Sequence, residues 1–141
     1  AVLEKGNTTD YEKAQKEKAK IGLLGEEVVI QHENERLLKI GKKAELVSKT
    51  KGDGLGYDVL SYNDDGSKRY IEVKSTNSSE RTTFYITATE LAACKKYGEA
   101  YYIYRLYKEN GEWQISYYQG KEVEALCNCP YQYAVAPESQ K

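Results

Sequence analysis

The sequence has little of several residue types on which common sites are built. Its 141 residues include no methionine, two prolines, one histidine and three cysteines. The single histidine, His32, excludes HNH-type and two-histidine phosphodiesterase centres, and we expect it on a helix surface. Cys94, Cys127 and Cys129 are an odd number without a CxxC pair, so neither a disulfide framework nor a zinc site is supported. Reduced thiols are the favoured reading, and a metal held by Cys127 and Cys129 is the alternative.

Long apolar runs are also absent. No stretch reaches the roughly 18 residues that span a bilayer, and the N-terminus lacks the apolar core of a signal peptide. The sequence therefore predicts a soluble protein, cytoplasmic or otherwise intracellular, with the nucleoid or nucleus included. The start at Ala1 and the lack of methionine lead us to expect a processed chain or an excised domain.

Neither sign of charge is in excess. Lysine and arginine number 21 against 22 aspartates and glutamates, a formal net charge of -1. No global basic field can therefore hold nucleic acid, and a phosphate partner must meet local patches. Residues 39–51 carry five lysines and one glutamate. A solvated strand edge and loop is the favoured interpretation of this run, and a phosphate-binding patch is the alternative.

The length favours one domain, and the patterning predicts an α/β fold with helices around a mixed sheet. Residues 1–20 form a polar helix or arm, 21–120 the domain, and 121–141 a C-terminal extension of loop or docked chain. We expect helices over 9–20, 22–40 and 87–98, with stops at Gly41 and Gly98. Strands are expected over 44–48, 57–62, 69–75, 99–107 and 112–118, and 82–86 is a candidate for a further short strand.

A hairpin is predicted between the second and third strands. The intervening segment 63–67, NDDGS, has the residues that tight turns require. A loop of three or five residues places Asp58 directly opposite Glu72, whereas a two-residue loop moves Asp58 to the other face. We favour the odd-length loop, because it sets Val59 on the same face as the apolar residues of strand 69–75.

Opposed side chains in such a pair lie about 5 Å apart, which suits two carboxylates that share one hard cation. Lys74 projects from the same face as Glu72, where an ammonium can orient a water and offset charge on a phosphate. Asp58, Glu72 and Lys74 thus suit metal-assisted phosphodiester hydrolysis. The alternative is a surface ion pair between Glu72 and Lys74, with Asp58 at a strand start.

These residues resemble a known group. "GYD" at 56–58 and "IEVK" at 71–74 are similar to the motifs of the PD-(D/E)xK nuclease superfamily. The segments GLLGEEVV, GDGLGYDVLS, RYIEVKST, FYITATE and YYIYRLY, in that order over 22–107, resemble the NO VEIN C-terminal type of domain. The resemblance implies a restriction endonuclease-like core of helix, three strands, helix and strand, here with an added hairpin. Tyr57 stands where the superfamily usually has proline.

The resemblance also implies roles for single positions. Asp58 and Glu72 would bind Mg²⁺ or Mn²⁺, the main-chain carbonyl of Val73 would be a further ligand, and Lys74 would assist the nucleophilic water. Glu26 would reach the site from the first long helix as an accessory acid. An ordinary helix glutamate is the alternative for Glu26.

The partners follow from the same resemblance. It implies a DNA endonuclease acting on double-stranded DNA within a restriction, defence or DNA-processing system, with a helicase or targeting domain attached, and it admits a homodimer. The alternative is a catalytically inactive module that keeps the nuclease fold to bind nucleic acid or a protein partner.

Three further features leave two interpretations open. Glu90 fits a capping box with Thr87, which we favour over a supporting role in the site. Arg105, on an apolar strand, pairs with a buried acid in the favoured interpretation and contacts phosphate in the other. The glycines of 52–56 form a plain turn or a flexible approach loop for DNA.

Overall fold

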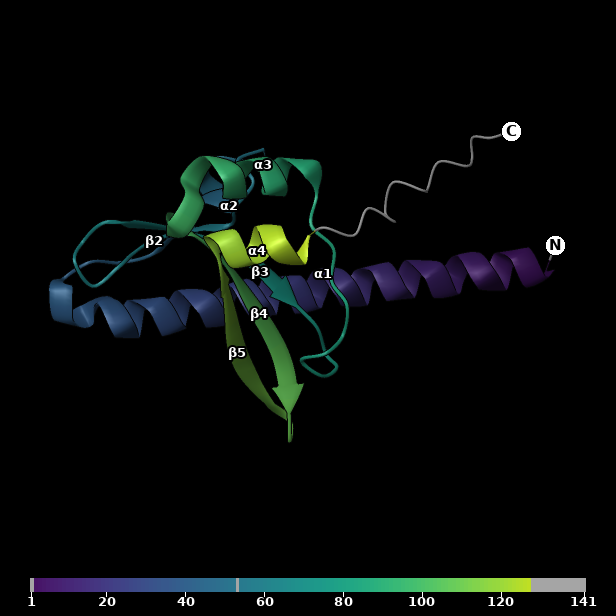
Figure 1. Cartoon of the computed structure of the whole chain (residues 1–141). Coiled ribbons are helices and arrows are strands. Elements are labelled where there is room, and N and C mark those ends of the chain that lie inside the picture. The colour runs from purple at the N-terminus through teal and green to yellow at the C-terminus, as the bar shows by residue number, and fades with distance from the viewer. Residues whose placement is uncertain (1, 53, 128–141) are drawn as a thin grey trace.

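The structure, a computed structural model that describes residues 2–52 and 54–127, places helices on both faces of a five-stranded sheet (Figure 1). In chain order the elements are α1 (Val2–Leu37), η1 (Leu38–Ile40), β1 (Glu45–Leu46), α2 (Val47–Thr50), β2 (Val59–Tyr62), β3 (Lys68–Ser75), α3 (Ala88–Tyr97), η2 (Gly98–Ala100), β4 (Tyr101–Glu109), β5 (Glu112–Gln119) and α4 (Gly120–Leu126).

The strands lie in the sheet in chain order, from β1 to β5. Neighbouring strands are antiparallel except β3 and β4, which are parallel and are joined through α3. A parallel pair needs such a crossover, because the chain must return to the same end of the sheet. The predicted α/β class with a mixed sheet is confirmed.

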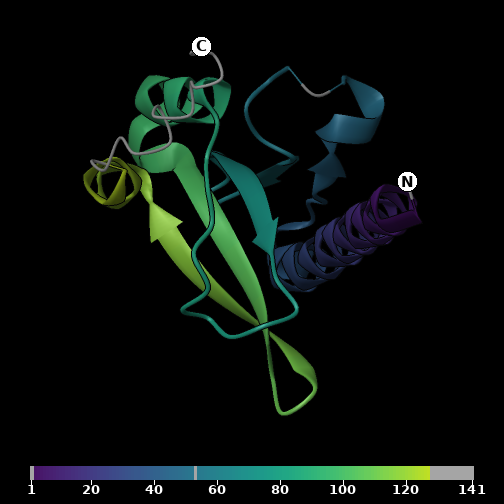
Figure 2. The same cartoon turned by 90° about the vertical axis from the view of Figure 1, so that its right-hand side faces the viewer.

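Each face of the sheet buries its own core. α1 covers one face, where Val29 packs against Val59, Ile71, Tyr104 and Leu106. α3 and α4 lie on the other face, as Figure 2 shows, and a second cluster centred on Tyr101 and Ile103 fills the space beneath them. β4 lies under both clusters and is buried from Tyr101 to Leu106 except at the half-buried Tyr102. Both alternating sets of its side chains are largely apolar, as expected of a strand that is covered on both faces.

The β2–β3 hairpin has the predicted register. Val59 pairs with Ile71 and Tyr62 with Lys68, which leaves a five-residue loop, 63–67. Side chains alternate between faces along a strand, so Val59 and Ile71 both point toward α1. The same alternation turns Glu72 and Lys74 toward α3.

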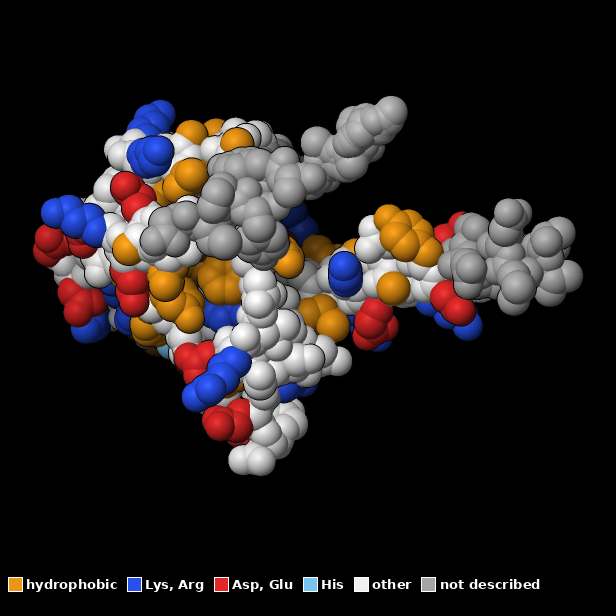
Figure 3. Space-filling model, turned by 45° about the vertical axis from the view of Figure 1, so that its right-hand side comes forward, with side chains coloured by type: hydrophobic (Ala, Val, Ile, Leu, Met, Phe, Trp, Pro, Cys, Tyr) orange, Lys and Arg blue, Asp and Glu red, His pale blue; other side chains and the backbone are white. Residues whose placement is uncertain are grey.

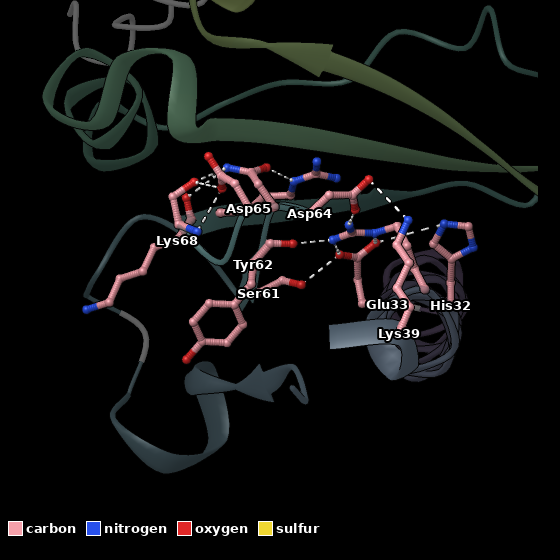
Figure 4. Close-up of polar contacts among 12 residues, drawn as sticks. His32, Glu33, Lys39, Ser61, Tyr62, Asp64, Asp65 and Lys68 are labelled. Atoms are coloured by element: carbon pink, nitrogen blue, oxygen red, sulfur yellow. Dashed lines mark hydrogen bonds and ion pairs between the residues drawn. The ribbon is translucent and has the colours of Figure 1, made fainter. Parts of the chain in front are cut away.

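A buried carboxylate joins α1 to the sheet (Figure 4). Glu33 is 0% exposed and accepts hydrogen bonds from Ser61 (2.7 Å), Tyr104 (2.9 Å) and Arg36 (2.5 Å). Arg36 also donates to the main-chain carbonyl of Tyr62. Burial alone raises the pKa of a carboxyl, but these hydrogen bonds lower the pKa of Glu33 below its ordinary value. Glu33 is therefore an ionised structural residue, which the sequence analysis missed.

The first helix is longer than predicted. The stretches expected over 9–20 and 22–40 form one helix, α1, followed by a 3-10 turn that ends at Gly41 as predicted. Residues 9–20 are all exposed, and this part of α1 projects from the rest of the molecule (Figures 1 and 3). No helix within the described ranges is long and apolar enough to cross a membrane.

The strand predicted over 44–48 is wrong for most of its length. β1 contains two residues, and the chain then turns into α2. The main-chain amides of Val47 and Ser48 both donate to the carbonyl of Asp58, at 2.9 and 3.4 Å. This sharing of one acceptor ends the ladder with β2 and begins the helical turn.

Two other expectations need correction. The candidate strand 82–86 forms no strand, and its residues cross the sheet as an irregular segment. α4 begins at Gly120, where loop or docked chain is predicted, and the main-chain amide of Gln119 donates to Glu122 at its start (3.4 Å). The remainder of the predicted extension, 128–141, lies outside the described residues and includes Cys129.

α1 approaches β3 closely at Gly25. A Cβ built on Gly25 would lie 1.8 Å from the hydroxyl oxygen of Ser75 and 3.0 Å from its Cβ. A Cβ on Gly22, one turn earlier, meets nothing within 4 Å. The absence of a side chain at Gly25 thus sets the depth at which the helix packs.

We predict opposite effects for alanine at these two glycines. Gly25→Ala should lower the free energy of unfolding by about 1–2 kcal/mol, because the methyl group forces α1 away from β3. Gly22→Ala should raise it by about 0.5–1 kcal/mol through helix propensity alone. Urea denaturation followed by circular dichroism measures both. Equal stabilisation by the two substitutions would contradict the packing described here.

Candidate functional site

Asp58 and Glu72 meet on the α3 face of the sheet. Asp58 precedes β2, and its main-chain amide donates to the carbonyl of Ile71 (2.8 Å). Its Oδ2 accepts from the main-chain amide of Val73 (2.9 Å), and its carboxyl lies close enough to that of Glu72 for each to shift the pKa of the other. The predicted juxtaposition of the two acids is therefore confirmed.

The segment before Asp58 is pinned against α3. Gly56 has φ of 82°, and a Cβ there would lie 2.7 Å from both Ala93 and the carbonyl of Thr89. Tyr101 donates its hydroxyl to the carbonyl of Gly56 (2.9 Å). The flexible approach loop considered for the glycines of 52–56 is thus wrong at Gly56, where the glycine serves close packing that fixes the position of Asp58.

Tyr57 is held by aromatic contacts. Its ring packs edge-on against Tyr70 (5.0 Å between centroids) and Tyr97 (5.8 Å), which stack on one another at 3.8 Å. Such edge-to-face and stacked pairs stabilise beyond the area that they bury. At the position where the resemblance expects proline, the chain before Asp58 is thus restrained by side-chain packing.

The electrostatics of the acid pair are unfavourable to two charges. Glu72 is 6% exposed. Burial, followed by the nearby carboxylates of Asp58 and Glu90, raises the pKa of Glu72 to about 10, with Lys74 acting in the opposite direction. Burial also raises the pKa of Asp58, against the hydrogen bonds from Val73 and Glu72. At neutral pH Glu72 is therefore protonated, so the two acids do not both carry a negative charge.

Lys74 lies between two carboxyl groups. Its Nζ is 3.4 Å from Oε2 of Glu72 and 2.8 Å from Oε1 of Glu90. Burial lowers the pKa of an ammonium, but Glu72 and Glu90 outweigh this and raise the pKa of Lys74. The ammonium is thus charged, nearly buried and fixed in direction.

Glu90 combines the two roles weighed for it. It completes the predicted capping box of α3, since its Oε1 accepts from the main-chain amide of Thr87 (3.0 Å) and its own amide donates to Thr87 Oγ1 (3.1 Å). The same Oε1 accepts from Lys74. The capping motif reveals the first role, but only the packing of α3 over β3 reveals the second.

The structure places Glu26 differently from the acid pair. Glu26 follows Gly25 on α1, beside the end of β3, and is half-buried. α1 packs on the face of Val73, whereas Glu72 and Lys74 point toward α3, so a contact of Glu26 with them would have to pass around the end of β3. The accessory role of Glu26 stays a prediction. The role of the Val73 carbonyl as a metal ligand also stays a prediction, and the main-chain group of Val73 that contacts Asp58 is its amide.

The donor set fits a hard divalent cation in type and number. Within the ranges that the structure describes, no group of three or more His, Cys, Asp and Glu side chains is arranged to hold a metal. Mg²⁺ commonly uses only one or two carboxylates and keeps several waters. Asp58 and Glu72 supply two carboxyl groups, which is the number that such a site needs. In the metal-free protein the proton on Glu72 removes their mutual repulsion.

Arg105 pairs with no acid of the described residues, contrary to the favoured interpretation. It is 2% exposed and donates to the main-chain carbonyls of Lys74 (3.2 Å) and Thr82 (2.9 Å). Burial lowers its pKa. Its position links the end of β3 to the irregular segment before α3.

The cysteines and the basic run are the remaining candidates. Cys94 and Cys127 are free thiols in the described chain, while Cys129 lies outside it. In the basic run, Lys39 pairs with Asp64 (3.2 Å) and Lys42 lies over the ring of Tyr62 (4.7 Å). These contacts match the favoured interpretation of a solvated edge.

Comparisons with known proteins agree on one family. The family model described as "Protein NO VEIN, C-terminal" matches residues 25–118, more than half of the chain. A curated relative from Arabidopsis thaliana, "Protein NO VEIN-LIKE", is 34% identical over 84 residues, which cover 58% of this chain and 12% of the relative. The chain thus spans a small part of that relative's length. No solved structure matches the chain.

We predict that the metal-free protein loses stability as pH rises. Unfolded, Glu72 releases its proton near the ordinary pKa of 4.5, but folded only near about 10. Between these values the unfolded state binds fewer protons, so the free energy of unfolding falls, by up to about 1.4 kcal/mol per pH unit from this group.

Glu72→Gln, which keeps the shape and a donor, should remove that slope and raise the stability at pH 8. Thermal unfolding in EDTA from pH 5 to pH 9 measures the effect. Glu109→Gln, at an exposed hairpin end, is the matched control. The same pH slope in wild type and Glu72→Gln would contradict a buried protonated acid.

Proposed function

The chain belongs to the NO VEIN C-terminal family, and on that premise we propose that it is a Mg²⁺- or Mn²⁺-dependent nuclease domain that hydrolyses DNA phosphodiester bonds. We assign it to the PD-(D/E)xK superfamily, with a restriction endonuclease-like core. The order α1, β1 to β3, α3 and β4 is the order expected for that core and supports the assignment.

One observation carries the proposal. Asp58, just before β2, and Glu72 in β3 share a largely buried position with a charged lysine. Unlike Glu33, whose charge is met by three donors, these acids have one ammonium that Glu90 shares, so the set contributes little to the stability of the fold. Groups with strongly perturbed pKa values, brought together from separate elements, are typical of catalytic centres.

Asp58 and Glu72 are the residues that would hold the cation, with the Val73 carbonyl as a further ligand. A bound divalent cation stabilises negative charge on the phosphate and lowers the pKa of a bound water. Lys74 orients the attacking water with its fixed ammonium and offsets charge that grows on the phosphate. Glu90 positions Lys74 and is itself held by Thr87, so α3 sets the direction of the ammonium.

We propose double-stranded DNA as the substrate, in a restriction, defence or DNA-processing system. The short share of the relative that the chain covers supports a larger protein in which other segments, such as a helicase or targeting domain, select the DNA. Glu26 is proposed as the accessory acid at the end of β3.

A specific observation favours a second function. The net charge of -1 gives no general attraction to DNA, whereas a free-standing nuclease usually has a clearer basic surface. The alternative is a non-catalytic module of the same fold that binds nucleic acid or a protein.

Lys74→Ala should reduce DNA hydrolysis at least about a hundredfold, since it removes the group that positions the water. Plasmid and linear duplex DNA, incubated with Mg²⁺ or Mn²⁺, provide the assay. Lys39→Ala, whose lysine pairs with Asp64 on the surface, should cleave as wild type does. Equal cleavage by wild type and Lys74→Ala would reject the assignment, and cleavage by neither would favour the binding module.

Metal binding should release a proton at neutral pH. Glu72 is protonated in the metal-free protein and must ionise to act as a ligand, so close to one proton should leave for each Mn²⁺ bound. Titration calorimetry in buffers of different ionisation enthalpy counts these protons. Glu72→Gln should abolish the release and weaken binding. Tight binding of Mn²⁺ to Glu72→Gln, as to wild type, would place the metal elsewhere.

A further inference from the structure

A cavity of about 580 Å³ lies beside the acid site, on the α3 face of the sheet. The chain between β3 and α3 crosses β4 and β5 (Figure 2), and its residues 80–87 form one wall. This segment is fastened to the sheet, because the carbonyl of Ser78 accepts from Lys108 and Glu80 accepts from Ser116. The other described residues that line it are Ala88 and Leu91 of α3, Tyr118 of β5, and Leu126 and Cys127 at the end of α4.

The walls suit a flat, partly polar ring. Phe84 and Tyr118 line the cavity with their rings 5.9 Å apart. Thr83, Phe84 and Ile86 belong to no helix or strand, and between described residues none of them has a main-chain hydrogen bond. Their amides and carbonyls are therefore available to a ligand, and exposed Arg81 adds a positive charge at the cavity, beside Glu80, which accepts from Ser116.

Two chains of hydrogen bonds join the cavity to Lys74. Thr82, in the wall, accepts from Arg105, which also donates to the carbonyl of Lys74. Thr87, also in the wall, donates to Glu90, which accepts from the ammonium of Lys74. One side chain, Arg105 on the first route and Glu90 on the second, thus lies between the cavity wall and Lys74.

We propose that this cavity binds a single unstacked nucleobase of the nucleic-acid strand whose phosphate lies at Asp58 and Glu72. The inference rests on the proposed function and names the part of the substrate that the domain reads. Nucleobases stack on aromatic side chains and present donors and acceptors at their edges, which matches Phe84, Tyr118 and the unpaired main chain. A base drawn out of its stack leaves its phosphate beside Lys74.

The test compares two single strands of equal length, oligothymidylate and the same sugar-phosphate chain without bases. Fluorescence anisotropy measures their affinities for the full chain in Ca²⁺, which binds carboxylate and phosphate oxygens as Mg²⁺ does but with looser geometry. Wild type should bind the strand with bases about tenfold more tightly. Equal affinity for the two strands would overturn the proposal.

Two alanines of α3 offer a matched pair of variants. Ala88 and Ala92 are both exposed, but only Ala88 lines the cavity. Ala88→Trp should fill the cavity and remove most of the tenfold preference, while Ala92→Trp should keep it. A preference that survives in Ala88→Trp would overturn the proposal.

Parallel cleavage assays separate this inference from the nuclease assignment. Loss of the base preference in Ala88→Trp, with no cleavage by wild type, supports the base site in a binding module. Cleavage that depends on Lys74, with no effect of Ala88→Trp on affinity, overturns the base site alone. A base preference that emerges only after deletion of residues 128–141 also overturns it for the full chain, since the chain's own C-terminal segment would then occupy the cavity.

Discussion

The register of the β2–β3 hairpin is the constraint on which both faces of the sheet depend. It sends Val59 and Ile71 into the core under α1 and brings Asp58 and Glu72 together under α3. A slip of one residue would exchange the two sets, burying acids against α1 and exposing the core residues. The apolar core thus fixes the position of the acids without any attraction between the acids themselves.

Glu33 and Glu72, two buried acids of the described chain, have opposite protonation states at neutral pH. Glu33 is surrounded by donors from three elements and stays ionised, as a buried charge must be when it serves the fold. Glu72 has another carboxyl as its neighbour and one ammonium that it shares with Glu90. A charge on Glu72 would be incompletely compensated, so Glu72 holds a proton in the metal-free protein.

Much of the fold was predictable because its signals are local. The turn at 63–67, the alternation in β3 and β4, and the Thr87–Glu90 box depend on neighbours in sequence. The second contact of Glu90 and the burial of Glu33 were not predictable, since each requires a partner that only tertiary packing supplies. The same holds for the two carbonyls that receive Arg105 and for the short β1, which ends where Asp58 accepts from α2.

The positions of three candidate site residues were predictable to the same degree. Spacing alone brought Asp58, Glu72 and Lys74 together, because a hairpin of known loop length fixes which residues face one another. Spacing could not place Glu26, since the rotation of α1 about its axis depends on the contact of Gly25 with Ser75. Nor could it reveal the cavity, whose walls come from segments far apart in the chain.

The bare backbone of Gly25 against Ser75 makes the two sides of the sheet unequal in stiffness. α1 packs closely against β3 at Gly25 and is also hydrogen-bonded to the sheet through Glu33. A shift of the helix toward the sheet would therefore cause steric clashes. The opposite side is closed by the irregular chain ahead of α3 and by side chains that can change rotamer. A conformational change that admits a bulky molecule is therefore expected on the side to which Glu72 and Lys74 point, with α1 held in place.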